Sequence, residues 1–186
     1  MNKNKLPSVN EIHTIVFDFD GVFTNNKVWV DQDGRESVCC DRSDGLAFDI
    51  LRIFQRKNNL VLDIFILSKE TNSVVASRAK KLKIDFYQGI DNKMLFIEKH
   101  LYKRFPNEAD IFDGLVYLGN DLNDLQVMQK AGFSIAPSDA HKLICDVANR
   151  IFPQRGGDGF VRAFIEELLG IDQLTKEQVN ELIFDC

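Results

Sequence analysis

Five short apolar segments, with helical patterns between them, constrain the fold more than any other feature of this sequence. They cover residues Ile12–Phe19, Leu60–Leu67, Lys83–Tyr87, Leu115–Leu118 and Phe133–Ala136. Segments of this length are typical of strands, and their alternation with helices is typical of a parallel sheet with helices on both faces. We therefore expect an α/β fold with a doubly wound parallel sheet.

Two other regions add structure outside that alternation. Residues Lys27–Cys40 form two short runs around an Asp-Gly dipeptide, which is a strong signal for a β-hairpin. The C-terminal stretch, 160–186, predicts two amphipathic helices, Phe160–Leu169 and Thr175–Phe184, divided at Gly170. We expect these helices to pack on the domain rather than to bind a partner.

Length and composition predict one globular domain over residues 1–186. The net charge of −5 and the pI of about 5.2 argue against a nucleic-acid partner, so local cations must attract an anionic substrate. The N-terminus lacks the apolar region of a signal peptide, and no apolar run is long enough to span a membrane. We expect a cytoplasmic protein with four reduced cysteines, because none has the spacing of a zinc site: Cys39, Cys40, Cys145 and Cys186.

The first apolar segment ends in two carboxylates followed by a glycine. Asp18 and Asp20 are separated by one residue and precede Gly21. Alternate residues of a strand point the same way, so both carboxylates start on one face at its carboxyl end unless the chain bends there. Ligands of open α/β sheets bind at this edge, and paired carboxylates favour a hard cation such as Mg²⁺. An acidic strand end before an ordinary turn is the alternative when this segment is considered alone.

Three later segments place polar residues in a consistent order. Ser68 follows the second apolar segment, Lys93 opens a helical pattern, and Gly119-Asn120-Asp121 follows the fourth apolar segment. Together with Asp-Phe-Asp-Gly-Val-Phe-Thr at residues 18–24, they resemble the four motifs of the haloacid dehalogenase superfamily of phosphohydrolases. Each motif alone has a structural explanation such as helix capping, but all four in order are hard to obtain by accident. The resemblance implies a Rossmann-like fold and a phosphomonoesterase.

The resemblance also implies a role for each motif residue. Asp18 would attack phosphorus to form an aspartyl phosphate, and Asp20 would protonate the leaving sugar oxygen and then deprotonate water. Ser68 would donate to a phosphoryl oxygen, and Lys93 would pair with the phosphate and hold the nucleophile ionised. Mg²⁺ would shield the approach of one anion to another. Its expected ligands are Asp18, Asp20, Asn120 and Asp121.

The fourth motif departs from the family pattern at Asn120. Many relatives have Gly-Asp-Asp, so an amide stands here at the position of the direct metal ligand. An amide oxygen adds no charge, and we expect weaker metal affinity, with Asp121 and Asp124 in support. Asparagine also resembles members associated with cytidylyltransferases. The alternative to an enzyme is therefore a non-catalytic tetramerisation or regulatory module beside an acylneuraminate cytidylyltransferase, although retention of Asp20 favours an active enzyme.

The residues between the first motif and the next helix are enough for a hairpin only, whereas some members of the superfamily carry a whole cap domain there. This matches a capless branch that includes 3-deoxy-D-manno-octulosonate 8-phosphate phosphatases, phosphatases of nine-carbon keto-deoxy sugar acids and a domain of animal acylneuraminate cytidylyltransferases. The resemblance implies a homotetramer assembled by hairpin 27–40, in which a neighbouring subunit closes each site. The alternative is a hairpin folded back on its own domain.

Specificity would come from residues outside the phosphate clamp, on a phosphorylated 2-keto-3-deoxy sugar acid. Ser68-Lys69-Glu70 looks more like the nine-carbon acid phosphatases than the octulosonate phosphatases, so the nine-carbon class is slightly ahead. An arginine such as Arg78 can bind the carboxylate of such an acid bidentately. The alternative for Arg78 and Lys81 is a solvated helix face that also carries Lys80 and Lys83. The expected substrate-side residues are Ser43, Asp44, Glu70, Arg78, Lys81 and Arg155.

Overall fold

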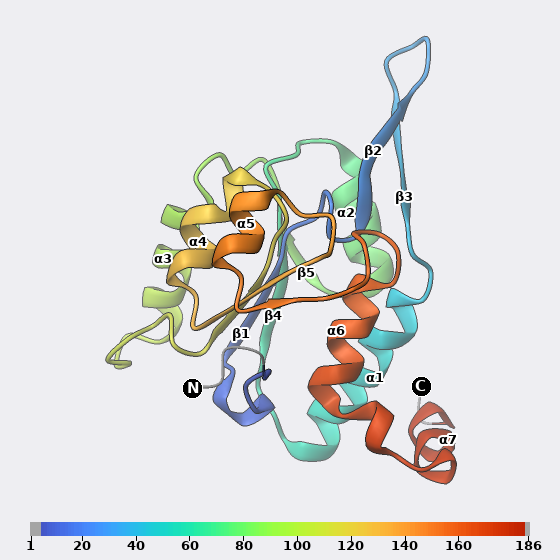
Figure 1. Cartoon of the computed structure of the whole chain (residues 1–186), viewed down its shortest axis with the longest axis vertical. Coiled ribbons are helices and arrows are strands. Elements are labelled where there is room, and N and C mark those ends of the chain that lie inside the picture. Colours follow the sequence, from blue (N-terminus) through green and yellow to red (C-terminus); the bar gives the residue numbers. More distant parts are fainter. Residues whose placement is uncertain (1–4, 185–186) are drawn as a thin grey trace.

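A six-stranded parallel sheet forms the centre of the molecule (Figure 1). The computed structural model describes residues 5–184. The strands lie in the order β5 (Asp85–Tyr87), β4 (Asp63–Leu67), β1 (Thr14–Phe17), β6 (Leu115–Leu118), β7 (Phe133–Ala136) and β8 (Arg150–Ile151). The chain runs outward from β1 in one direction and from β6 in the other, so the neighbours β1 and β6 form the switch point where ligands of such sheets bind. The expected α/β, Rossmann-like fold is confirmed.

Helices cover both faces of the sheet (Figure 1). One face packs against α1 (Asp44–Asn58), α2 (Ser73–Leu82) and α6 (Phe160–Leu169), and the other against α3 (Lys93–Arg104), α4 (Leu125–Lys130) and α5 (Lys142–Val147). The alternation of β1 divides the core in two, since Ile15 and Phe17 enter the first layer and Val16 enters the second. The two expected C-terminal helices are present as α6 and α7 (Lys176–Phe184), with Gly170 between them.

Several strand limits differ from the sequence expectation. β1 is shorter than Ile12–Phe19, because Ile12 ends a 3₁₀ turn, η1 (Val9–Glu11), and the chain bends after Phe17. Residues 60–62 are coil before β4, and β5 begins only at Asp85. Sequence patterns did not predict β8, whose two residues are too few to show a period.

The expected hairpin projects from the body of the molecule as a separate two-stranded sheet (Figure 1). It comprises β2 (Thr24–Val30) and β3 (Glu36–Cys40), and starts three residues earlier than the sequence suggested. A hydrogen bond of 3.0 Å from Asn72 Nδ2 to Glu36 Oε2 ties the first residue of β3, beside the hairpin turn, to the N-terminus of α2. Val28, Trp29 and Val30 on β2 are 51%, 60% and 60% exposed, so this ribbon does not fold back onto its own domain.

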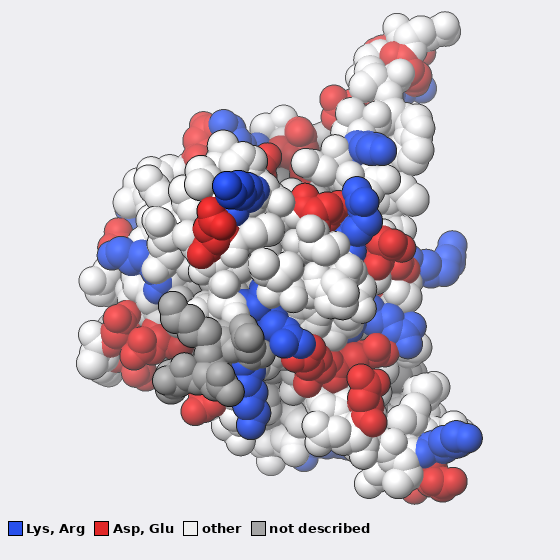
Figure 2. Space-filling model, in the orientation of Figure 1, with Lys and Arg blue, Asp and Glu red and all other residues white. Residues whose placement is uncertain are grey.

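Surface features agree with the composition. Acidic and basic side chains are interspersed over the face seen in Figure 2. Among residues 5–184, no helix has the length and apolar character that a membrane crossing requires. Cys39, Cys40 and Cys145 are free thiols, whereas Cys186 and the first four residues of the N-terminus lie outside the described residues.

Candidate active site

The turn after β1 brings the two motif-one carboxylates to the switch point between β1 and β6. Asp18 continues the pairing with β6, since its backbone N–H donates to Leu118 O at 2.9 Å, and its Oδ1 accepts from the N–H of Phe19 at 2.7 Å. The chain then bends through Gly21, at φ +78°. A Cβ on Gly21 would lie 1.8 Å from Asn120 Nδ2, so glycine is required where the first and fourth motifs meet.

Lys93 joins the carboxylates of two motifs. It is the first residue of α3, whose N-terminus is capped by Asn92, and it is almost fully buried. Its Nζ lies 2.7 Å from Asp18 Oδ1 and 2.8 Å from Asp124 Oδ1. One ammonium therefore serves two buried carboxylates, which come from opposite sides of the β1–β6 junction.

Burial and these neighbours shift the pKa values of the three groups. Desolvation, reinforced by the charge of Asp124, raises the pKa of Asp18 to about 8, although Lys93 opposes this. Burial alone would lower the pKa of Lys93, but Asp18 and Asp124 outweigh it, so the lysine remains charged. Desolvation and then the charge of Glu70 raise the pKa of Asp20, against a hydrogen bond from Thr24. Asp18 thus needs additional positive charge to ionise at neutral pH, and Asp20 is suited to carry a proton.

A cavity of about 310 Å³ opens above these groups. Three of the four expected catalytic residues line it. The complete lining comprises Asp18, Asp20, Ser68, Lys69, Glu70 and Asn123. Ser68 follows β4 and is 1% exposed, and its Oγ accepts the backbone N–H of Glu70 at 3.0 Å. Its hydroxyl hydrogen is free to point toward an anion in the cavity.

The oxygens beside the cavity fit a hard divalent cation. Asn120 Oδ1 is buried and has no hydrogen-bond partner within the described part of the chain. A buried acceptor without a partner costs free energy unless a bound ligand interacts with it. Asp18 and Asp20 add two carboxylates. No group of three or more His, Cys, Asp or Glu residues suited to a metal occurs among residues 5–184, so the third protein oxygen would be the Asn120 amide. Asp121 is exposed, and its Oδ1 accepts a hydrogen bond from Leu122 N at 2.7 Å. Asp121 is therefore less well placed than Asn120 to bind the cation.

The expected substrate-side residues are dispersed. Glu70 lines the cavity, but its Oε1 already accepts two backbone N–H groups, from residues 71 and 72. Arg78 of α2 lies 3.4 Å from Asp44 Oδ2 at the start of α1, next to Ser43, and also donates to a backbone carbonyl at residue 41. Asp44 is buried, and desolvation raises its pKa to about 7 although Arg78 lowers it. The expected carboxylate-binding arginine is thus paired with a carboxylate of its own chain.

Two other expected residues lie farther from the cavity lining. Lys81 is exposed on α2, and Arg155 is 70% exposed and pairs with Asp139 at 3.4 Å. The glycine-rich segment 154–159 nevertheless contacts the site. A Cβ on Gly156 would lie 2.0 Å from the carbonyl oxygen of Gly21, so this segment packs directly on the turn that carries Asp20.

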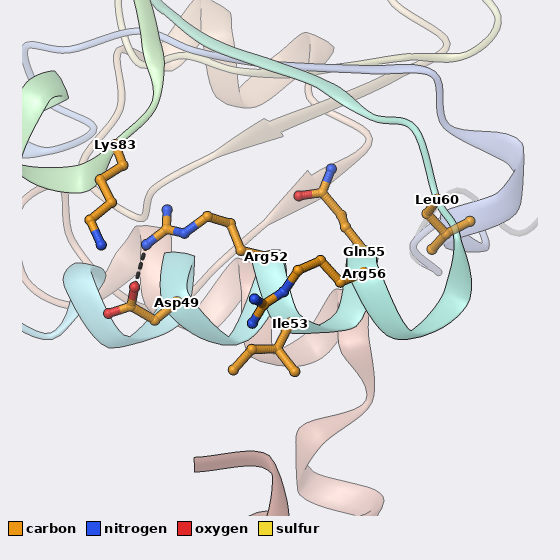
Figure 3. Close-up of a pocket in the computed structure, with 7 residues that line it drawn as sticks. All are labelled: Asp49, Arg52, Ile53, Gln55, Arg56, Leu60 and Lys83. Carbon is orange, nitrogen blue, oxygen red and sulfur yellow. Dashed lines mark hydrogen bonds and ion pairs between the residues drawn. The ribbon is translucent and has the colours of Figure 1, made fainter. Parts of the chain in front are cut away.

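A larger hollow, of about 450 Å³, lies away from this chemistry (Figure 3). Its lining comprises Asp49, Arg52, Ile53, Gln55, Arg56, Leu60 and Lys83. Arg52 pairs with Asp49 and donates to Leu82 O at 2.8 Å, at the C-terminus of α2. Cations at helix C-termini complement the helix dipole, so the charge of this hollow needs no ligand.

The fold and the carboxylate–lysine site define a hydrolase of the α/β class, and comparisons specify it further. A HAD (haloacid dehalogenase) family hydrolase from Streptomyces avermitilis is 38% identical, with a TM-score of 0.79 over 92% of this chain and 94% of that one. The 3-deoxy-D-manno-octulosonate 8-phosphate phosphatase of Salmonella typhi is 28% identical over 165 residues, 88% of this chain and 82% of the relative. No family model matches the chain.

One solved relative has been determined with its ligands bound. The 3-deoxy-D-manno-octulosonate 8-phosphate phosphatase of Moraxella catarrhalis, in complex with magnesium, phosphate and the sugar acid, is 27% identical, with a TM-score of 0.74 over 87% of this chain and 88% of that one. The similarity to the Streptomyces protein over almost the whole of both chains shows that this chain belongs to the haloacid dehalogenase family. The expected phosphomonoesterase class and the resemblance to octulosonate phosphatases are confirmed.

Proposed function

We propose that this protein is a Mg²⁺-dependent phosphatase of a phosphorylated 2-keto-3-deoxy sugar acid. One observation carries the proposal: a buried ammonium, Lys93 Nζ, lies 2.7 Å from Asp18 Oδ1 at a cavity that Asp20 and Ser68 also line. A nucleophile, a proton carrier and two groups that can bind a phosphoryl oxygen are thereby gathered on about 310 Å³ of open space. This size and polarity suit a sugar phosphate.

Asp18 is the nucleophile in this proposal. Attack of its carboxylate on phosphorus forms an aspartyl phosphate and releases the sugar oxygen, which takes the proton of Asp20. Asp20 then removes a proton from the water that hydrolyses the aspartyl phosphate. Lys93 and Ser68 bind the phosphoryl oxygens, and positioning together with charge neutralisation supplies most of the acceleration.

Mg²⁺ fits the oxygens that the site offers. Asp18, Asp20 and the unpartnered Oδ1 of Asn120 would hold it, and Asp121 is a further expected ligand. When bound, the cation would neutralise charge between the nucleophile and the phosphate. Magnesium in the Moraxella relative supports this assignment.

Two sugar acids are candidate substrates. The names of the relatives support octulosonate 8-phosphate, an eight-carbon acid, and we propose it first. The nine-carbon, sialic-acid-like 9-phosphates are the second candidate, because Glu70 lines the cavity within the Ser68-Lys69-Glu70 segment that resembles their phosphatases. Release of Arg78 from Asp44 would provide a guanidinium for the carboxylate of either acid.

Phosphate release from both acid phosphates, measured with Mg²⁺ and with EDTA, tests the proposal. We expect Mg²⁺-dependent turnover that Asp18→Asn abolishes and that the control Asp172→Asn, at an exposed carboxylate, retains. Preference for one acid would identify the substrate. Absence of turnover on every ester, in protein that is folded, would reject the enzyme and favour the non-catalytic module beside a cytidylyltransferase.

We further propose that hairpin 27–40 assembles a homotetramer. Three consecutive exposed apolar residues, 28–30, on a two-stranded ribbon that is marginal alone support an interface. Val30→Asp should shift the sedimentation coefficient toward that of a smaller species. The control Val61→Asp introduces the same charge at a residue that is 83% exposed before β4, and should leave the assembly unchanged. A wild-type protein that sediments as a monomer would refute the proposal.

A further inference from the structure

Asp124 receives more hydrogen bonds than any assigned role for it requires. It is fully buried, and its Oδ2 accepts the backbone N–H groups of Asn120 at 3.0 Å and Asp121 at 3.3 Å. Its Oδ1 accepts Lys93 Nζ at 2.8 Å and the hydroxyl of Tyr117 at 2.7 Å. Asp124 therefore fixes both the lysine of the third motif and the loop that carries Asn120.

Tyr117 reaches this carboxylate from beneath the site. It lies in the middle of β6, is fully buried, and has its ring in the core layer between the sheet and helices α3 to α5. A buried hydroxyl without a partner is costly, so the hydroxyl and Asp124 hold each other in one arrangement. A Cβ on Gly119 would come within 2.7 Å of Asp124 Cγ, which shows how closely the loop fits around this carboxylate.

The charges of Asp18, Asp124 and Lys93 explain why a hydroxyl on Asp124 matters. Two buried carboxylates, Asp18 and Asp124, share a single ammonium, so each competes with the other for Lys93. The Tyr117 hydroxyl is a neutral donor, and it supplies one of the hydrogen bonds that Asp124 Oδ1 needs without adding charge. The ammonium can then remain 2.7 Å from Asp18, where the reaction needs it.

We infer that Tyr117 is a positioning residue of the phosphatase, which acts through Asp124 to hold Lys93 on Asp18 and to hold Asn120 in place. The inference rests on the proposed roles of Asp18, Lys93 and Asn120. Loss of the hydroxyl leaves Asp124 Oδ1 with Lys93 as its side-chain donor among the described residues, and draws the ammonium away from the nucleophile. Ser68, the other phosphate-binding group, keeps its place at the cavity, so turnover suffers more than ground-state binding.

Tyr117→Phe tests this inference, and Tyr87→Phe, on the half-buried edge strand β5, is the matched control. Kinetics are measured with p-nitrophenyl phosphate and Mg²⁺ at a temperature where circular dichroism shows each variant folded. We expect kcat of Tyr117→Phe to fall about 10- to 100-fold, the effect of losing one hydrogen bond to a charged group, while KM changes less than threefold. The control should retain the wild-type kcat.

A second arm tests the route through Asp124. If the tyrosine acts through that carboxylate, Asp124→Asn and the double variant with Tyr117→Phe have the same kcat; multiplied losses overturn the route. Folded Tyr117→Phe with wild-type kcat overturns the inference, whereas a wild-type protein inactive on every phosphate ester rejects the proposed function instead. A fall in kcat that follows only the unfolded fraction would likewise overturn the positioning role.

Discussion

Asp18→Asn is expected to stabilise the metal-free protein while it abolishes turnover. In the folded protein the pKa of Asp18 is raised from 3.8 to about 8, first by burial and then by Asp124. The folded state therefore holds this proton more tightly than the unfolded state, and its stability falls as the pH rises from about 4 to about 8. Each pH unit within that window costs up to about 1.4 kcal/mol. The amide retains an oxygen for Lys93 and does not titrate.

The magnitude can be measured as a difference between two melting curves. From pH 5 to pH 7 the wild type should lose up to about 2.7 kcal/mol more than Asp18→Asn. For a chain of this size that corresponds to roughly 5–10 °C in Tm. Scanning calorimetry in EDTA at pH 5, 6 and 7 measures it, with Asp172→Asn as the control that should follow the wild type. Parallel decreases in Tm for the wild type and Asp18→Asn would refute the reasoning, because another group would then carry the pH dependence.

Three further variants test other parts of the site. Asn120→Asp should tighten Mg²⁺ binding in calorimetric titration by adding a ligand charge, and unchanged affinity would mean that position 120 does not contact the ion. Asp20→Asn should reduce kcat by roughly 10²–10⁴ through lost proton transfer, and wild-type turnover would remove it from the mechanism. Gly156→Ala should lower both kcat and Tm, because its Cβ would lie 2.0 Å from the carbonyl oxygen of Gly21; Gly45→Ala, which meets nothing within 4 Å, should lower neither.

Much of the architecture follows from local patterns in the sequence. The buried strand Leu115–Leu118 is a continuous apolar run, and Phe133–Ala136 is apolar except for Ser134; both have the length found in the structure. Parallel strands present their carboxyl ends at one edge of the sheet, so polar residues placed after several strands must gather there. That rule predicts that Asp18 and Ser68 share one site, and in the structure both line a single cavity.

The contacts within the site were decided only by tertiary structure. Tyr117 stands inside an apolar strand and its pattern predicts core, yet its hydroxyl binds Asp124. The substrate side shows the same limit, since a helix pattern could not reveal that Arg78 pairs with Asp44, 34 residues earlier in the chain. Periodicity reports which side of an element is buried, whereas the partner of a buried polar group depends on how distant elements pack. For this protein the sequence therefore determined the sheet, its functional edge and the chemical groups. The packing of α3 against the fourth-motif loop determined which carboxylates hold the lysine.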